Sequence, residues 1–217
     1  MKVGTDGVLL GAWADITGAR RILDVGAGCG LISAMLYQRI LSRSEIVAVD
    51  IDSGAIEDCR FNFESLKNDD DIRLIIIEGD FRSVIGDFDL IVSNPPFFKG
   101  DLEAAGKSRF LARQGNGLDY NTLIKYSKEH LSDKGHLVFI SDIRYENDIH
   151  FHAEFFELKL LKKCQVHTKS GKSAKRILWD FVKYEVKSPE ISKITLYDSD
   201  GNRHSEYVKL TKDYYLD

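Results

Sequence analysis

Short apolar runs rich in β-branched residues alternate with longer segments of helical periodicity along the chain. The short runs predict strands, and apolar positions that recur every three to four residues predict helices. The expected strands are 21–25, 45–50, 72–78, 88–93, 136–141, 163–168 and 177–185. The expected helices are 31–41, 53–66, 120–131 and 145–161. Strands that alternate with helices favour right-handed βαβ units, and hence an α/β fold with helices on both faces of a parallel sheet.

The last two expected strands differ from the others because only a short polar loop, 169–175, joins them. This loop has no room for a crossover helix, so the two strands should pair antiparallel as a hairpin. The sheet is therefore expected to have seven strands, mostly parallel, with an antiparallel last strand. No internal repeat or low-complexity linker interrupts the chain, which favours a single domain over residues 1–217.

The composition is that of an ordinary globular chain, with 43% hydrophobic and 29% charged residues. No apolar run approaches the ~20 residues that a membrane span needs, and no signal peptide is evident. The three cysteines lie far apart in the sequence, and the six histidines show no ligand spacing. We therefore expect no disulfide framework, no metal and a reducing, cytoplasmic location.

The net charge of −4 argues against a general nucleic-acid binder, but the charge is unevenly distributed. Residues 159–176 carry seven Lys or Arg and no acid. Such a run is typical of a solvated helix end and loop, and it would also suit a local phosphate-binding patch. The sequence leaves both interpretations open.

A glycine-rich loop follows the first expected strand, with Asp24, Gly26, Gly28 and Gly30 at every second position. Glycines between a strand and a helix let a ligand approach backbone N–H groups at the helix start. A dinucleotide-binding loop would have the spacing G-x-G-x-x-G, which this loop does not match. A plain tight turn is the alternative.

Two further acids follow neighbouring strands of the expected sheet. Asp50 ends the second strand and can accept hydrogen bonds from the hydroxyls of an adenosine ribose. Asp80 follows the third and can accept from the adenine amine, with Phe81 packed on the ring. A helix N-cap is the alternative for Asp50, although Asp52 or Ser53 fits that role better, and an ordinary strand exit is the alternative for Asp80.

The four residues Asn94, Pro95, Pro96 and Phe97 follow the fourth strand. The prolines hold the backbone rigid and have no N–H, so the Asn94 side chain and the Pro95 carbonyl can accept both hydrogens of an exocyclic amine. Phe97 can stack on a base. Two acceptors free the delocalised lone pair of an aryl amine for attack on a sulfonium methyl, so catalysis would come from positioning and electrostatics. A structural proline turn is the alternative.

These motifs resemble those of a known enzyme class. The loop from Asp24 to Gly30 is similar to motif I of class I methyltransferases, which use S-adenosylmethionine. The resemblance implies a Rossmann-like fold, an Asp24 that meets the methionyl ammonium directly or through water, and glycines that make room for the cofactor. Residues 94–97 resemble the [N/D]-P-P-[Y/F] motif of enzymes that methylate adenine N6, guanine N2, cytosine N4 or glutamine N5.

The start of the chain narrows the resemblance. Residues 2–14 (KVGTDGVLLGAWA) are similar to the N-terminal signature of bacterial tRNA (adenine-N6)-methyltransferases that modify the base 3′ of the valine tRNA anticodon. Matches at 112–113, 205–207 and 214–216 extend the likeness over essentially the whole chain. The resemblance implies a cofactor-covering segment of about residues 1–18, in which a polar turn with Thr5 and Asp6 touches the methionyl part and precedes an apolar helix. The family usually has a further stretch before this signature, which leaves open whether Met1 is the natural start.

The resemblance implies an enzyme that transfers methyl groups to adenine N6 in tRNA. The sequence shows no sign of an obligatory protein partner, so we expect a monomer. Another amine (guanine N2 in rRNA, adenine N6 in DNA or glutamine N5 in protein) and a non-catalytic cofactor- or RNA-binding module remain alternatives. Segment 98–119 is either a substrate loop or an ordinary surface loop. Under the resemblance, the cations of this segment and of the basic run become candidates for tRNA contact. These candidates are Lys99, Arg109, Arg113, Lys169, Lys172, Lys175 and Arg176.

Overall fold

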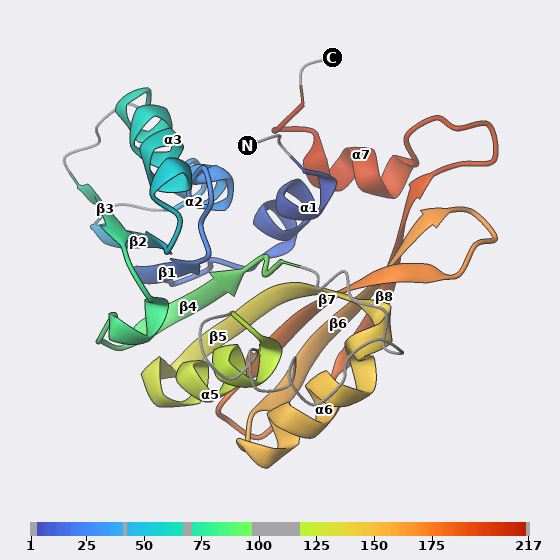
Figure 1. Cartoon of the computed structure of the whole chain (residues 1–217). Helices are drawn as coiled ribbons and strands as arrows, with labels where there is room; N and C mark the ends of the chain where they lie inside the picture. The colour runs from blue at the N-terminus through green and yellow to red at the C-terminus, as the bar shows by residue number, and fades with distance from the viewer. Residues whose placement is uncertain (1–3, 41–42, 67–70, 97–117, 216–217) are drawn as a thin grey trace, which may run out of the picture.

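The computed structural model describes residues 4–40, 43–66, 71–96 and 118–215 (Figure 1). Within these ranges, eight strands form one sheet in the order β3-β2-β1-β4-β5-β7-β6-β8. The strands are β1 Arg21–Val25, β2 Ser44–Asp50, β3 Ile72–Glu78, β4 Phe88–Ser93, β5 Leu131–Asp142, β6 Lys159–Lys169, β7 Ala174–Val182 and β8 Glu190–Tyr197. The helices are α1 Thr5–Trp13, α2 Leu31–Tyr37, α3 Ser53–Glu64, α5 Tyr120–His130, α6 Glu146–Phe155 and α7 Ser205–Thr211, with short 3₁₀ turns η1 Phe81–Ser83 and η2 Ile143–Tyr145.

The first five strands run parallel, as the alternation of strands and helices predicts. The strand order reverses between β1 and β4, so a crevice opens at the carboxyl ends of these strands, where open α/β sheets bind ligands. The predicted hairpin is confirmed, since β6 and β7 pair antiparallel. Because β7 also pairs antiparallel with β5, the β6–β7 turn lies at the carboxyl edge of the parallel strands.

The expectation of seven strands is wrong by one. The additional strand, β8, pairs parallel with β6 and ends the sheet. Only Ile194 and Leu196 of this strand are buried, and its first four residues are exposed. Its stability therefore depends on pairing with β6.

The helix expected over 145–161 also ends earlier than its periodicity suggests. Glu157 adopts a left-handed conformation with φ 55°, and the Leu158 N–H donates to the Ala153 carbonyl at 2.8 Å. This arrangement closes the helix as a Schellman motif does, although glycine usually occupies the left-handed position. The chain then enters β6 at Lys159, so the basic run 159–176 forms a strand pair and not a helix end and loop.

Helices cover both faces of the sheet, as expected (Figure 1). One face packs against α5 and α6 through Leu123 and Ile149. The other packs against α1, α2 and α7, with Leu9 and Leu36 fully buried, and α3 closes its far end. None of the helices in the described ranges is long and apolar enough to span a membrane.

Candidate functional site

A cavity of about 570 Å³ opens at the carboxyl edge of β1, β2, β3 and β4. Its wall comes from the loop after each strand, together with the start of α1. The wall includes Gly26–Cys29 after β1, Asp50–Asp52 after β2, Gly79–Arg82 after β3, Asn94 and Pro96 after β4, Gly4 and Gly7 from α1, and Leu118. The sheet thus brings together segments that are far apart in the sequence.

The glycine loop is held in a tight path against β2. Gly26 and Gly30 have φ of 68° and 77°, a conformation that glycine adopts without strain. A Cβ on Gly30 would lie 2.7 Å from Cys59 Sγ, so the loop leaves no space there for a side chain. The Gly28 N–H donates to Asp50 Oδ2 at 2.8 Å, which ties the loop to the end of β2. The backbone of the loop therefore forms a preorganised wall of the cavity.

Asp24 lies beneath this loop and is completely buried. Its Oδ2 accepts hydrogen bonds from the Ser33 N–H at 3.1 Å and from Ser33 Oγ at 2.7 Å. Among the described residues, no donor reaches its Oδ1. Burial raises the pKa of Asp24 to about 6, although the Ser33 bonds oppose that shift. Asp24 is not part of the cavity wall, so it would act on a ligand through the loop or a water molecule.

Asp50 and Asp80 both face the cavity, and each already has hydrogen-bond partners. Asp50 Oδ1 accepts from the Asp52 N–H at 3.0 Å, while Asp52 caps α3 by accepting from the Ala55 N–H at 3.0 Å. The expectation that Asp52, and not Asp50, caps this helix is therefore confirmed. Arg82 donates to both oxygens of Asp80 and lowers the pKa of that carboxyl. A ligand amine would have to share Asp80 with Arg82.

Asn94 lies where the cavity meets the end of β4 and is half-buried. The preceding residue is anchored, since Ser93 Oγ donates to the Val25 carbonyl at 2.8 Å. On the α1 side, a Cβ on Gly7 would lie 3.9 Å from Asn94 Nδ2, so helix α1 passes close to this amide. Pro95 is buried, Pro96 is exposed at the cavity rim, and Phe97 lies outside the described residues.

Comparison with known proteins agrees with this arrangement of loops. The family model of the methyltransferase small domain matches residues 5–169. A tRNA1(Val) (adenine(37)-N6)-methyltransferase of Phocaeicola vulgatus is 40% identical, covering 100% of this chain and 91% of the relative. The enzyme of the same name from Pasteurella multocida is 34% identical over 100% of this chain and 90% of its own length.

The chain belongs to the methyltransferase small domain family, in the branch of the tRNA1(Val) (adenine(37)-N6)-methyltransferases. The resemblance found in the sequence is thereby confirmed. Solved structures agree on the fold: a protein of Agrobacterium tumefaciens described as a predicted O-methyltransferase superposes with a TM-score of 0.70 at 19% identity, over 96% of both chains. A ribosomal protein L11 methylase of Lactobacillus delbrueckii gives 0.59 at 16% identity, over 82% of this chain and 78% of that one. The Rossmann-like class I methyltransferase fold is confirmed.

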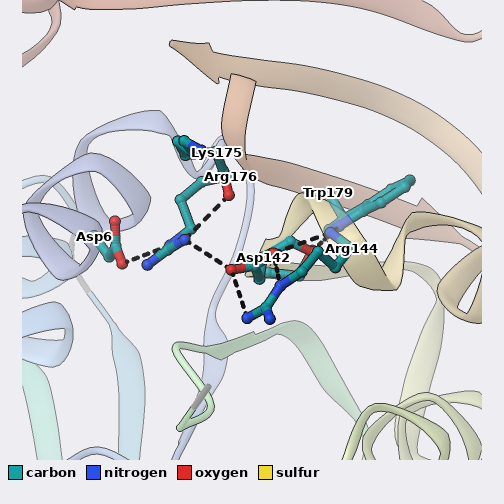
Figure 2. Close-up of polar contacts among 7 residues, drawn as sticks. Asp6, Asp142, Arg144, Lys175, Arg176 and Trp179 are labelled. Carbon is teal, nitrogen blue, oxygen red and sulfur yellow. Dashed lines mark hydrogen bonds and ion pairs between the residues drawn. The ribbon is translucent and has the colours of Figure 1, made fainter. Parts of the chain in front are cut away.

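In this methyltransferase, the N-terminal signature is helical from Thr5 onwards, whereas a polar turn before the helix was expected. Thr5 and Asp6 form the first turn of α1, and neither is part of the cavity wall. Gly4 and Gly7 line the cavity instead. The Asp6 carboxylate accepts from Arg176 Nε at 3.1 Å (Figure 2).

The basic run of the methyltransferase divides into two groups. Lys159, Lys162, Lys163 and Arg176 each form an ion pair with an acid from another part of the chain. The remaining three are Lys169, Lys172 and Lys175, called the hairpin lysines below, and they lie at or beside the β6–β7 turn. The turn lies at the same edge of the sheet as the cavity. The candidate RNA contacts Lys99, Arg109 and Arg113 lie outside the described residues.

Sequence reasoning missed several cavity residues, among them Ile51, Arg82 and Leu118. Ile51 directly follows Asp50 and is 68% exposed, an unusual environment for an apolar side chain at the end of a buried strand. Arg82 and Leu118 also line the cavity. Ile51 alone carried a signal in the sequence, because an apolar residue after a strand-ending acid can face a ligand bound at that acid.

Proposed function

We propose that this methyltransferase transfers a methyl group from S-adenosylmethionine to N6 of an adenine in tRNA, next to the anticodon of valine tRNA. The observation that carries the proposal is the position of Asn94 and Pro96 in the wall of the glycine-lined cavity, with Pro95 buried between them. Relatives at 34–40% identity over the full chain are named for this reaction. The amine motif alone would also suit guanine, cytosine or glutamine.

The cavity fits S-adenosylmethionine in size and in chemistry. Its volume of about 570 Å³ lies within the ~300–1,000 Å³ typical of small-molecule sites. Asp50 offers acceptors for ribose hydroxyls, and Asp80 offers one for the adenine amine. Ile51 and Phe81 supply apolar surface for the purine ring. The free oxygen of Asp24, which lies beneath the loop, suits the donor-rich methionyl ammonium through a water molecule.

The bound cofactor supplies a methyl group on a sulfonium, which is a strong electrophile. The residues of the chain have to position and activate the weakly nucleophilic amine. The Asn94 side-chain oxygen and the Pro95 carbonyl accept its two hydrogen bonds, which localises the nitrogen lone pair toward the methyl group. The Ser93 bond to the Val25 carbonyl holds both acceptors in place, so little reorganisation accompanies the reaction.

We further propose that the hairpin lysines, together with Lys99, Arg109 and Arg113, contact the tRNA backbone, and that Phe97 stacks on the target base. An unpaired anticodon-loop adenine leaves its stack at little cost and can reach a recessed site. A tRNA substrate and three buried, unpaired cysteines suit a cytoplasmic enzyme.

The test is incubation with methyl-labelled S-adenosylmethionine and tRNA that lacks the modification, followed by nucleoside mass spectrometry. The proposal predicts N6-methyladenosine in valine tRNA. Label in guanine or in protein glutamine would refute the acceptor and leave the amine chemistry intact. Asn94→Ala should lower turnover by a factor of ~100 or more, as loss of a transition-state hydrogen-bond group does, and keep cofactor binding. A non-catalytic module would show no turnover in either form.

A further inference from the structure

The first turn of α1 forms part of the cavity wall, and its start lacks a side-chain cap. Its N-cap, Gly4, provides no side-chain hydrogen bond to the helix, so the first backbone N–H groups lack the usual capping partner. The other end of α1 is well secured. Arg39 donates to the Gly11 carbonyl at 2.5 Å and to the Ala14 carbonyl at 2.8 Å. The helix is thus anchored at the end that is remote from the cavity.

Besides the packing of Gly7 and Val8, a long-range polar contact reaches the first turn. Arg176 Nε donates to Asp6 Oδ2 at 3.1 Å, and Arg176 Nη1 donates to Asp142 Oδ2 at 3.1 Å (Figure 2). Asp6 is separated from Arg176 by 170 positions in the sequence. All three side chains are less than a third exposed, so water screens their interaction only in part.

The sheet side of this contact is rigid. Arg176 and Asp142 are directly paired in the β5–β7 ladder. Arg144 also donates to Asp142, from Nε to Oδ1 at 2.9 Å and from Nη2 to Oδ2 at 3.2 Å. These bonds and the nearby cations lower the pKa of Asp142 against the effect of its burial, so it remains ionised. Arg176 therefore reaches from a fixed strand pair to α1.

We propose that Arg176 is a positioning residue that fastens the first turn of α1 against the cofactor cavity, and that it does not serve as an RNA contact. The proposal rests on the proposed function only in naming the cofactor. Among the described residues, Arg176 is the only ion-pair partner of Asp6. Replacing Arg176 therefore leaves the first turn of α1 without this ion pair. Gly4 and Gly7 then move more freely, and the cavity wall they form is no longer preorganised.

The consequence should differ from that of losing a phosphate contact. Loss of the fastening lowers affinity for the cofactor even when no RNA is present. Because Gly7 lies beside Asn94, loss of the Arg176–Asp6 contact also lowers kcat. Loss of a phosphate contact raises the KM for tRNA and reduces its salt dependence, with no effect on the cofactor.

The experiment measures the Kd for S-adenosylhomocysteine by calorimetry without RNA, in wild type and in Arg176→Met, Arg176→Lys and Asp6→Ala. Hydrogen exchange of the α1 amides is followed in the same variants. Since a hydrogen bond to a charged group is typically worth ~1.5–3 kcal/mol, Arg176→Met and Asp6→Ala, which each remove one partner of this bond, should each weaken binding ~10-fold or more and speed α1 exchange. Lysine lacks the planar fork that spans two carboxylates, so Arg176→Lys should rescue binding only in part. The double variant should bind no worse than Arg176→Met, because both changes remove one interaction.

Lys172→Ala is the matched control, since Lys172 lies on the same hairpin and should leave both readouts unchanged. The proposal is overturned if Arg176→Met leaves α1 exchange and cofactor affinity unaltered. If that variant instead raises the KM for tRNA and reduces the salt dependence of tRNA binding, Arg176 is an RNA contact. If Arg176→Met folds poorly, Asp6→Ala decides the question alone, because alanine favours the helix and the residue lies on a partly exposed helix turn. Wild type that binds the cofactor but never methylates tRNA refutes the proposed function and leaves the α1 result standing.

Discussion

Asp24 offers the sharpest energetic test of the structure, because its carboxyl is completely buried and has one oxygen without a donor among the described residues. Burial disfavours the charged form and raises its pKa from 3.8 to about 6, and the negative charge of Asp50 adds to the shift. In the unfolded chain the same group titrates near 3.8. Between pH 3.8 and about 6, Asp24 therefore takes up a proton when the chain folds.

The sign and size of the effect follow from this shift. Because the folded pKa is raised, the contribution of Asp24 to stability is fully present below pH 3.8 and is lost as the pH rises through about 6. About two pKa units correspond to about 3 kcal/mol, so ionised Asp24 should destabilise the cofactor-free protein by about that amount at pH 8. An asparagine keeps the acceptor for Ser33 and carries no charge.

The assay is urea unfolding of cofactor-free wild type and Asp24→Asn at several pH values between 4 and 8. All other titrating groups cancel in the difference between the two proteins. The variant should match wild type at pH 4 and exceed it by about 3 kcal/mol at pH 8, while its affinity for S-adenosylhomocysteine falls. A difference that does not change with pH, or a variant less stable than wild type throughout, would show that burial does not control this carboxyl.

Three other predictions test the loop, the hairpin and the cavity. Gly30→Ala should destabilise the protein by ~3 kcal/mol in urea unfolding, since left-handed strain adds to a clash with Cys59, whereas Gly171→Ala, with φ 75° and open space around it, should cost only ~1 kcal/mol. Equal losses of stability in the two variants would rule out the clash between the new Cβ and Cys59. Replacing the three hairpin lysines by alanine should reduce the slope of log K against log salt for tRNA binding by ~2, and an unchanged slope would exclude them from the interface. Ile51→Ala should weaken S-adenosylhomocysteine binding ~5-fold or more at unchanged thermal stability, because the exposed side chain loses apolar contact with a ligand and none with the core. A fall in stability without a fall in affinity would contradict this.

The sequence alone determined the parallel half of the sheet and the chemistry at its edge. β1, β3 and β4 begin and end where their apolar runs predict, because a continuous run of apolar, β-branched residues is a local signal. The glycine loop, the strand-end acids and the Asn-Pro-Pro turn were also recognisable, because each needs particular residue types at a fixed local spacing. Their convergence on one cavity followed from strand polarity alone.

The tertiary structure decided the features that depend on partners far away in the chain. β8 exists because β6 is available to pair with it. Helix α6 stops at Phe155 because Glu157 adopts a left-handed conformation, which its residue type does not signal. Arg176, which resembled an RNA contact within a basic run, lies against Asp6 and Asp142. Charge along the sequence shows which side chains can form ion pairs, but the order of strands in the sheet determines which of them meet.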